Sequence, residues 1–442
     1  MPAHAHVANV GDVAHVGVSL HPARAYSAVV HGTTVTPAEP VAPARADLEG
    51  AIAAAVEVAT RVAGGADAVT VDIAPLLLDT LLRPESEVPP VAVVRIVPRA
   101  ATDPVLARSP AEVVERRIVR RWTVAGGHDL LGNELCPLDS EGLAALCAEL
   151  PGTGIRHVAI VAAGSQARPA HEREVADAIL AAVPGARISV ASDYGGQGLV
   201  AREATVVLDC ALTSLTDRLL DRCERTLSRL PGGLQLRVAR GDGGYSTPSR
   251  IRVTPVVAFG ATEALELCGA AHLAGRSDCR VLLPHGDLWV AGEVRHGLAV
   301  VRPAEPAGVG TELVVPTAVL APEPVAHPEG LPYRKADVPV VRAAADRYLL
   351  ACVGAAVSRP ASWLDEVAFI ESGAQLERVR RDAEERATAM VMANGAAPGT
   401  THVAEISTVA VPYSPSGTVR VRVRVAGLPD VTPASLTPGA SP

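Results

Sequence analysis

The chain has 442 residues, of which 48% are hydrophobic and 20% charged, with a formal net charge of −8. This length and balance indicate two or three globular domains, and they exclude a disordered tail protein and a polycation built for nucleic acid. Lys335 is the only lysine, which rules out a phosphate loop of the G-x-x-x-x-G-K-[ST] type. Aromatic residues make up 2% of the chain, which argues against a stacking surface for bases or sugars.

The cysteines and the N-terminus indicate the compartment. Seven cysteines form an odd set without a C-x-x-C pair, as buried reduced thiols would. The N-terminus has no basic segment followed by an apolar one, and no apolar run reaches about 18 residues. We therefore expect a cytoplasmic protein with neither a membrane nor a nucleic acid as its partner.

The first 190 residues alternate strands with helices. A hairpin is predicted over Val13–Val30, with its turn at Leu20–Ala23. The clearest βαβ unit is Ile155–Val190. The other expected elements are a helix at Ala46–Ala63, strands at Val69–Ile73 and Val91–Val97, and a helix at Leu138–Leu150 begun by Asp139 or Ser140.

The rest of the chain continues the α/β pattern. We expect loops over 303–339, where Pro and Gly are dense, and an exposed-edge or one-sided strand at Thr418–Val425, where Val alternates with Arg. The predicted helices are Glu203–Arg229, Thr262–Ala274, Tyr348–Ala356 and Leu376–Asn394. The predicted strands are Gln235–Arg240, Arg280–Leu283 with its antiparallel neighbour Leu288–Glu293, Glu366–Ile370 and His402–Ile406.

Several short motifs occur in an order that a known family shares. Gly126–Asp129, followed by Gly132 and Pro137–Asp139, is similar to a G-G-H hairpin with a later P-L-D. The further matching segments are Arg168–Glu172 for N-P-x-H-E, Arg202-Glu203 for R-E, Asp242-Gly243 for D-G, and Gly269–Ala271 for G-A-A. On these residues the chain resembles the hydantoinase/oxoprolinase family over most of residues 13 to 427.

The resemblance implies a fold and an activity. The fold would be α/β, with two actin/sugar-kinase-like (ribonuclease H-like) lobes and mixed sheets. Residues 11–190 would form the N-terminal lobe, 195–427 the C-terminal lobe and 428–442 a flexible tail. The family opens cyclic amides such as 5-oxoproline or hydantoin with ATP and Mg²⁺, because phosphorylating an unreactive amide oxygen creates a leaving group. Family members often work with a second protein subunit.

The nucleotide motifs of the family are altered here. The family's first hairpin reads G-I-D-x-G-G-T-x-T-D, whereas Ser19 stands for the Asp and His21-Pro22 for the two glycines. Proline has no N–H to donate, and histidine prevents the close approach of phosphate that glycine permits. The second hairpin keeps only Gly286 of D-x-G-G-T-x-T-D, and Asp287 places negative charge where a phosphate would lie.

Two hypotheses follow from these losses. One is a hydrolase of cyclic amides with lost or altered ATP chemistry, so that ATP and Mg²⁺ are implied by the family but not by these motifs. The other is a non-catalytic pseudoenzyme that acts as a binding or assembly subunit. A small-molecule ligand, a second protein subunit or a second copy of the chain is the expected partner.

Candidate site residues lie in predicted turns. His128-Asp129 and His285 with Asp287 each place a histidine near a carboxylate that could orient it as a general base, and turn formation is the alternative for both pairs. The candidate anion-binding residues are Gly241, Asp242, Gly243, Gly244 and Gly286, although a D-G-G sequence is also a common turn. No metal site is expected, because His4, His6 and His15 have no carboxylate or cysteine at ligand spacing.

Overall fold

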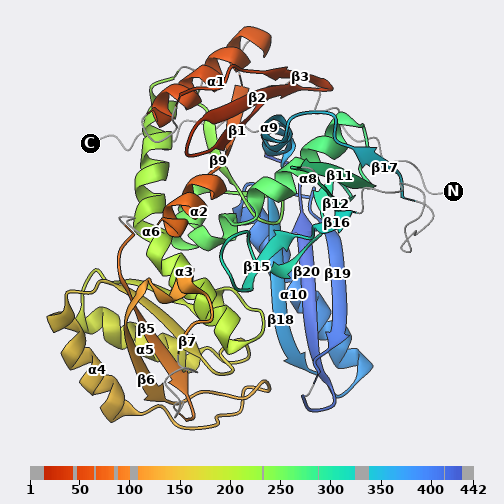
Figure 1. Cartoon of the computed structure of the whole chain (residues 1–442). Helices are drawn as coiled ribbons and strands as arrows, with labels where there is room; N and C mark the ends of the chain where they lie inside the picture. Colours follow the sequence, from red (N-terminus) through yellow and green to blue (C-terminus); the bar gives the residue numbers. More distant parts are fainter. Residues whose placement is uncertain are drawn as a thin grey trace, which may run out of the picture.

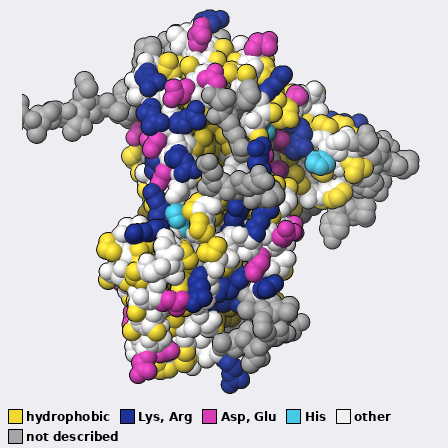
Figure 2. All heavy atoms as spheres, turned by 60° about the vertical axis from the view of Figure 1, so that its left-hand side comes forward, with side chains coloured by type: hydrophobic (Ala, Val, Ile, Leu, Met, Phe, Trp, Pro, Cys, Tyr) yellow, Lys and Arg dark blue, Asp and Glu magenta, His cyan; other side chains and the backbone are white. Residues whose placement is uncertain are grey.

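The computed structural model describes residues 14–42, 47–63, 66–83, 88–99, 108–230, 233–286, 288–323, 338–412 and 414–430. Within these ranges the chain forms five β-sheets with helices packed on them (Figure 1). On the face shown in Figure 2, basic and acidic side chains are interspersed, with apolar side chains between them. His4, His6 and Val13 lie outside the described residues.

The first sheet is mixed and joins the start of the chain to its middle. In spatial order its strands are β10 (Tyr245–Ser246), β9 (Gln235–Ala239), β4 (Ala66–Asp72), β1 (Ala14–Leu20), β2 (Ala25–His31) and β3 (Thr34–Pro37). β4 runs parallel to β1 and β9, and the other pairs are antiparallel. α1 (Leu48–Ala63) packs on Val16 and Val18, while α9 (Arg347–Val357) meets Gly17 on the opposite face. β1 is therefore buried on both faces.

The second sheet is parallel and lies in the lower part of Figure 1. Its strands, in order, are β6 (Ile118–Ala125), β5 (Val91–Val97), β7 (His157–Ala162) and β8 (Arg187–Val190). Its helices are α3 (Glu112–Glu115), α4 (Ser140–Thr153), α5 (Ala170–Ala182) and α6 (Leu199–Ser228), with the 3₁₀ turn η1 (Ala191–Asp193). Val94 and Ile160 face α4 and α5, whereas Val93 and Val161 face α6, so the strands carry continuous apolar runs.

Three smaller sheets complete the chain. The first contains β13 (Leu298–Ala299), β12 (Leu288–Arg295), β11 (Cys279–His285), β17 (Val340–Arg342) and, against β12, β16 (Ala321–Glu323). The second is the ribbon of β14 (Val301–Ala304) and β15 (Leu313–Ala318). The third has the order β18 (Ala361–Phe369), β20 (Thr418–Ala426) and β19 (His402–Ala410), covered by α10 (Gly373–Ala393). The remaining helical pieces are α2 (Ala74–Leu82), α7 (Pro248–Val253), η2 (Pro255–Ala258) and α8 (Ala261–Leu273).

Side-chain caps explain where several helices begin. The Asp139 carboxylate accepts from the amide of Gly142 at the start of α4, and Gly154 ends this helix in the left-handed conformation (φ 71°). Ser372 caps α10, and Asp346 caps α9 by accepting from the amide of Tyr348. The Asp346 cap positions the first turn of α9, which lines the cavity described below.

Glycines bring two helices and a strand into unusually close contact. A Cβ added to Gly269 of α8 would lie 2.0 Å from the Leu350 carbonyl of α9, and one added to Gly354 of α9 would lie 2.0 Å from the Leu265 carbonyl of α8. A Cβ on Gly17 of β1 would lie 1.8 Å from the carbonyl of Cys352. Since real Cβ atoms do not approach this closely, only glycine permits this packing of α8, α9 and the first sheet.

Most predicted elements are formed, but the loops predicted over 303–339 and the edge position of Thr418–Val425 need correction. Strands β14, β15 and β16 all extend into 303–339. The segment 313–318, predicted as loop, is strand β15, because Leu313, Val314 and Val315 are buried. Its prolines are tolerated since the ribbon has two strands and Pro303 pairs with Pro316. Thr418–Val425 lies in the centre of its sheet and not at an edge. Its one-sided character is confirmed, because the valines face α10.

The predicted boundary between lobes does not separate the sheets. β9 belongs to the predicted C-terminal lobe (195–427) but pairs with β4 in the first sheet. The division into 11–190 and 195–427 stays a prediction. At the C-terminus, residues 431–442 lie outside the described residues, while the Leu428 carbonyl accepts from the amide of Ala397.

One helical stretch in the described part of the chain is long and apolar enough to cross a membrane. It is Pro255–Leu273, which includes α8, and 72% of its most apolar window is buried inside the protein. Such burial is typical of a core helix in a soluble protein, and the packing of α8 on α9 accounts for it.

Replacement of a glycine at the helix contact tests its importance. Gly269→Ala is expected to lower the free energy of unfolding by about 3 kcal/mol, because the new methyl group meets backbone that cannot move alone. Urea unfolding followed by circular dichroism measures this change. Gly152→Ala in α4, where a Cβ meets nothing within 4 Å, is the matched control and should be neutral or stabilising by up to about 1 kcal/mol. Equal effects of the two variants would contradict the close contact.

Candidate functional site

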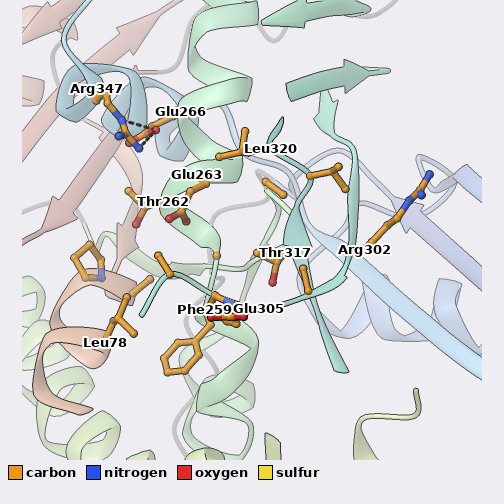
Figure 3. Close-up of a pocket in the computed structure, with 18 of the residues that line it drawn as sticks. Leu78, Phe259, Thr262, Glu263, Glu266, Arg302, Glu305, Thr317, Leu320 and Arg347 are labelled. Carbon is orange, nitrogen blue, oxygen red and sulfur yellow. Dashed lines mark hydrogen bonds and ion pairs between the residues drawn. The ribbon is translucent and has the colours of Figure 1, made fainter. Parts of the chain in front are cut away.

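A cavity of about 880 Å³ lies beside the start of α8 (Figure 3). Its walls come from the first hairpin, α2, the start of α8, the β14–β15 ribbon and the start of α9. Both hairpins at which the family resemblance expects nucleotide motifs reach this cavity, the first with His21 and the second with Pro284. The cavity is therefore the part of the molecule in which the altered motifs meet.

Aromatic rings gather at the turn of the first hairpin, where the family motif would have glycine amides. The Tyr26 and Tyr348 rings stack with centroids 4.1 Å apart, and the His21 ring meets Tyr348 edge-on at 4.8 Å. The amide of His21 donates to the Arg24 carbonyl within the turn. Burial, with a contribution from Arg347, lowers the pKa of His21 to about 4, so this imidazole is neutral at pH 7.

Asp72 ties the first hairpin to α8 beneath the cavity. Its side chain is fully buried, and its Oδ2 accepts from Ser19 Oγ at 3.0 Å and from Thr262 Oγ1 at 2.7 Å. Its Oδ1 accepts from the amide of Ala74 at 3.0 Å. Burial raises the pKa of Asp72 to about 6, although these hydrogen bonds oppose the shift. The carboxylate thus joins β1, β4, α2 and α8 at one point.

A second carboxylate is paired with an arginine. Arg347 donates from Nη2 and Nε to Glu266 Oε2 at 2.7 and 2.9 Å. Burial raises the pKa of Glu266 to about 7 in spite of this pairing. Arg347 Nη1 also lies 3.0 Å from His285 Nδ1, so the guanidinium is shared between α8 and the end of β11. Asp287, the predicted partner of His285, lies outside the described residues, and their catalytic role stays a prediction.

Two polar groups that line the cavity have no partner. Glu263, in the first turn of α8, has neither a hydrogen bond nor an ion pair within the described part of the chain, and Figure 3 shows it next to Thr262 at the cavity. Thr317 is 7% exposed, and its Oγ1 is buried without a hydrogen-bond partner. Buried hydroxyl groups are normally satisfied, so Thr317 is an exception in this part of the chain.

His128 and Asp129 use their side chains separately. The Asp129 carboxylate accepts from the amides of Leu131 and Asn133 at 2.8 and 2.9 Å, which closes its own loop. His128 is 3% exposed, and its ring lies 4.3 Å from the ring of His171. The hydrogen bonds of Asp129 thus follow the turn interpretation, while a catalytic role of either residue stays a prediction.

His128, Glu134 and His171 are the group of possible metal ligands found among the described residues, with ligand atoms within 4.8 Å of one another. The amide of Gly127 donates to His171 Nδ1 at 2.9 Å, so in the neutral ring the proton sits on Nε2. That nitrogen faces Glu134 Oε1 at 3.2 Å and acts as its donor. A histidine ligand needs a free lone pair at the nitrogen that faces the metal, so the geometry fits a hydrogen-bonded His171 better than a metal centre.

The loop of Gly241, Asp242, Gly243 and Gly244 is buried, and its polar groups bond to other groups of the protein. Three of its amides donate inside the chain: Gly241 to the Val257 carbonyl, Gly243 to the Arg240 carbonyl and Gly244 to Asp242 Oδ1. Asp242 forms an ion pair with Arg240, whose charge holds the pKa of this carboxyl below its ordinary value against the effect of burial. Three of the amides that would cradle a phosphate are therefore used within the chain, and an anion-binding role of this loop stays a prediction. Gly286 lies in an exposed turn (φ 59°) and stays a candidate.

The other motif residues hold the second sheet to α6. Glu172 is fully buried and accepts from the amides of Ala162 and Ser192, both at 2.8 Å. Arg202 donates to the Ala162 carbonyl at 3.1 Å and lies 3.8 Å from Glu172. Glu203 forms a bidentate pair with Arg95 of β5. These motif side chains therefore act in packing and charge pairing.

Comparison with known proteins identifies the relationship. A family model described as the hydantoinase/oxoprolinase N-terminal region matches residues 105–183. Acetone carboxylase, in a nucleotide-free structure titled for its ATP-dependent mechanism, has a TM-score of 0.61 at 11% identity, covering 95% of this chain and 89% of that one. The ATP-dependent caprolactamase from Pseudomonas jessenii has a TM-score of 0.65 at 11% identity, covering 95% and 88%.

The predicted resemblance to the hydantoinase/oxoprolinase family is confirmed. The predicted mixed α/β, two-lobed, actin-like fold is also confirmed. No curated protein matches the chain. The match to the family model contains His128, Glu134, His171 and Glu172, whereas the segments that line the cavity lie outside it.

Sequence reasoning missed several residues of the cavity. An acidic residue at the end of a buried strand was a usable signal for Asp72. Nothing in the sequence indicated Glu263 or Thr317, since a glutamate in a first helical turn and a threonine in a strand are ordinary. The pairing of Arg347 with Glu266 joins residues 81 positions apart, which no local pattern shows.

The buried carboxyl of Asp72 should make stability depend on pH. Its folded pKa of about 6 lies above the ordinary value of 3.8, so the folded state binds the proton more strongly and this contribution to stability falls as the pH rises from about 4 to about 6. The free energy of unfolding of Asp72→Asn, taken relative to that of the wild type, should therefore be about 3 kcal/mol higher at pH about 7 than at pH about 4. Urea unfolding at both pH values measures the difference, and Asp382→Asn on the exposed face of α10 is the control. A constant difference would show that Asp72 titrates normally.

The histidine group should not respond to zinc. The Nε2 nitrogen of His171 that faces Glu134 carries a proton and so has no free lone pair for a metal. We therefore expect the midpoint temperature of thermal unfolding to stay unchanged when Zn²⁺ is added. A bound ion at about 100 times its Kd would add about 2.7 kcal/mol of stability, an effect easily seen by calorimetry. A rise in midpoint that disappears in His171→Ala would overturn this assignment.

Proposed function

We propose that the chain is a pseudoenzyme of the hydantoinase/oxoprolinase family, a binding subunit whose cleft takes a small molecule without hydrolysing ATP. The observation that carries this proposal is the cavity at α8, which has four carboxylate residues in its lining. It is bordered by the turn expected to hold phosphate, which here contains His21 and Pro22. Phosphoryl transfer needs donors and cations that stabilise negative charge, and this cavity presents the opposite character.

The charges of the cavity support the proposal. ATP would meet Glu263, which has no hydrogen bond or ion pair among the described residues, and Arg347, a guanidinium in the lining, is already bound to Glu266. The buried Asp72 lies beneath and binds the hydroxyl of Ser19, the residue that replaces the family's aspartate. Asp72 is enclosed by hydrogen bonds from protein groups, which leaves it unsuited to hold a magnesium ion in contact with phosphate.

A second candidate is a family hydrolase of cyclic amides with altered ATP chemistry. It is favoured by the family-model match at residues 105–183, which includes His128, Glu134 and His171 beside one another. The caprolactamase found by comparison is described as ATP-dependent, and its fold covers 95% of this chain. An activity at the histidine group would need neither the first nor the second hairpin.

The partners and the location belong to the same proposal. A binding subunit implies a second protein subunit or a second copy of the chain, and reduced cysteines favour the cytoplasm. The described cysteines are unpaired, and five of the seven are buried.

Calorimetric titration with Mg-ATP, together with a phosphate-release assay in the presence of 5-oxoproline, hydantoin or caprolactam, tests the two candidates. We expect no heat of binding and no phosphate release from the full-length protein. An ATP-dependent caprolactamase serves as the positive control, and heat-denatured protein as the blank.

The two results separate the candidates. ATP binding with amide-stimulated release of phosphate would overturn the pseudoenzyme proposal and support the hydrolase. Amide hydrolysis without ATP would point to the histidine group, and loss of that activity in His128→Ala would locate it there.

A further inference from the structure

We propose that the cavity beside α8 binds a small organic cation, an amine with an apolar body whose ammonium group lies against Glu263. This inference rests on the proposed function, namely that the cleft does not take ATP.

The charges around the cavity favour a cation. Four carboxylates line it, those of Glu263, Glu266, Glu305 and Asp346, against the guanidiniums of Arg302 and Arg347. Arg347 is held by Glu266 and His285, and Figure 3 shows Arg302 extending away from the other lining residues. Negative charge in a cavity with apolar walls concentrates cations there.

Glu263 is the carboxylate available to the ligand. Glu266 is engaged by Arg347, and Glu305 accepts from the amide of Gly310 at 3.1 Å. Glu263 lies in the first turn of α8, where the helix dipole stabilises its ionised form. An ammonium group would give this carboxylate a charge-assisted hydrogen bond that the protein does not supply.

The remaining lining residues fit an organic ligand. Leu78, Phe259 and Leu320 provide an apolar wall, and their side chains surround the space in Figure 3. Thr317 Oγ1 is buried and unpartnered, so it can accept from or donate to a polar atom of the ligand. A volume of about 880 Å³ lies within the range of about 300–1,000 Å³ that small-molecule sites occupy.

Two other ligand classes fit less well. An anion would find Arg347 already bound to Glu266, and Arg302 extends away from the other lining residues in Figure 3. The amide of His21 in the turn is bonded to the Arg24 carbonyl. A metal ion would need several ligand atoms that converge on one point, and the group found among the described residues, His128, Glu134 and His171, lies outside this cavity. An amine requires one carboxylate and an apolar wall, which is what the cavity offers.

Three indoles of equal size but different charge test the proposal: tryptamine (cationic), tryptophol (neutral) and indole-3-propionate (anionic). Titration of the full-length protein should show tryptamine binding about tenfold more tightly than tryptophol, the effect of one charge-assisted hydrogen bond, and no binding of indole-3-propionate. Glu263→Gln should remove the preference for tryptamine while tryptophol binds as before. Glu384→Gln, on the exposed face of α10, is the matched control and should leave all affinities unchanged.

A second variant covers the case in which Glu263→Gln fails to fold. Thr317→Val keeps the shape of the side chain, removes its unpartnered hydroxyl and should weaken tryptamine and tryptophol to a similar extent. Equal binding of tryptamine and indole-3-propionate, or no binding of any indole, would overturn this inference and leave the proposed function standing. Binding of Mg-ATP without any binding of tryptamine would overturn both.

Discussion

The structure depends on the contact between α8, α9 and β1, which three glycines make possible. Gly269 and Gly354 let the two helices touch through their backbones, and Gly17 lets α9 lie directly on the first sheet. Because α9 begins at Arg347 and α8 begins at Ala261, this contact also fixes where their first turns lie. The cavity is formed by those first turns together with the turn of the first hairpin.

The position of the buried charges follows from this arrangement. Asp72 at the end of β4 meets Ser19 of β1 and Thr262 of α8, and Glu266, one helical turn further on, meets Arg347 of α9. Each of these bonds joins segments that lie far apart in the sequence. Burial raises the pKa of both carboxyls. The cavity beside them is lined by carboxylates and apolar side chains, whereas a nucleotide site needs hydrogen-bond donors and cations.

Residues that match the family motifs and residues that depart from them lie in different parts of the structure. Glu172, Arg202 and Gly269 keep the family pattern, and each acts in packing or in a buried hydrogen-bond network. His21 and Pro22 depart from the pattern, and they lie at the cavity or next to it. The residues that match the family motifs therefore pack the fold, whereas those that differ from the motifs border the cavity.

The sequence by itself determined the α/β class, the first hairpin, the βαβ unit at 155–190 and the family resemblance. Each of these depends on local patterns: apolar periodicity, caps such as Asp139, and motifs in a fixed order. It also showed that His21 and Pro22 had replaced two glycines, since the loss of an amide donor and the added bulk are properties of the residues themselves.

Only the tertiary structure decided the rest. It showed that three amides of the Gly241–Gly244 loop donate inside the protein and that Asp129 closes its own turn. It also showed that Glu263 and Thr317 line a cavity and have no hydrogen-bond partner in the described part of the chain. Whether a buried polar group has a hydrogen-bond partner depends on residues from distant parts of the chain, which a local sequence pattern does not identify.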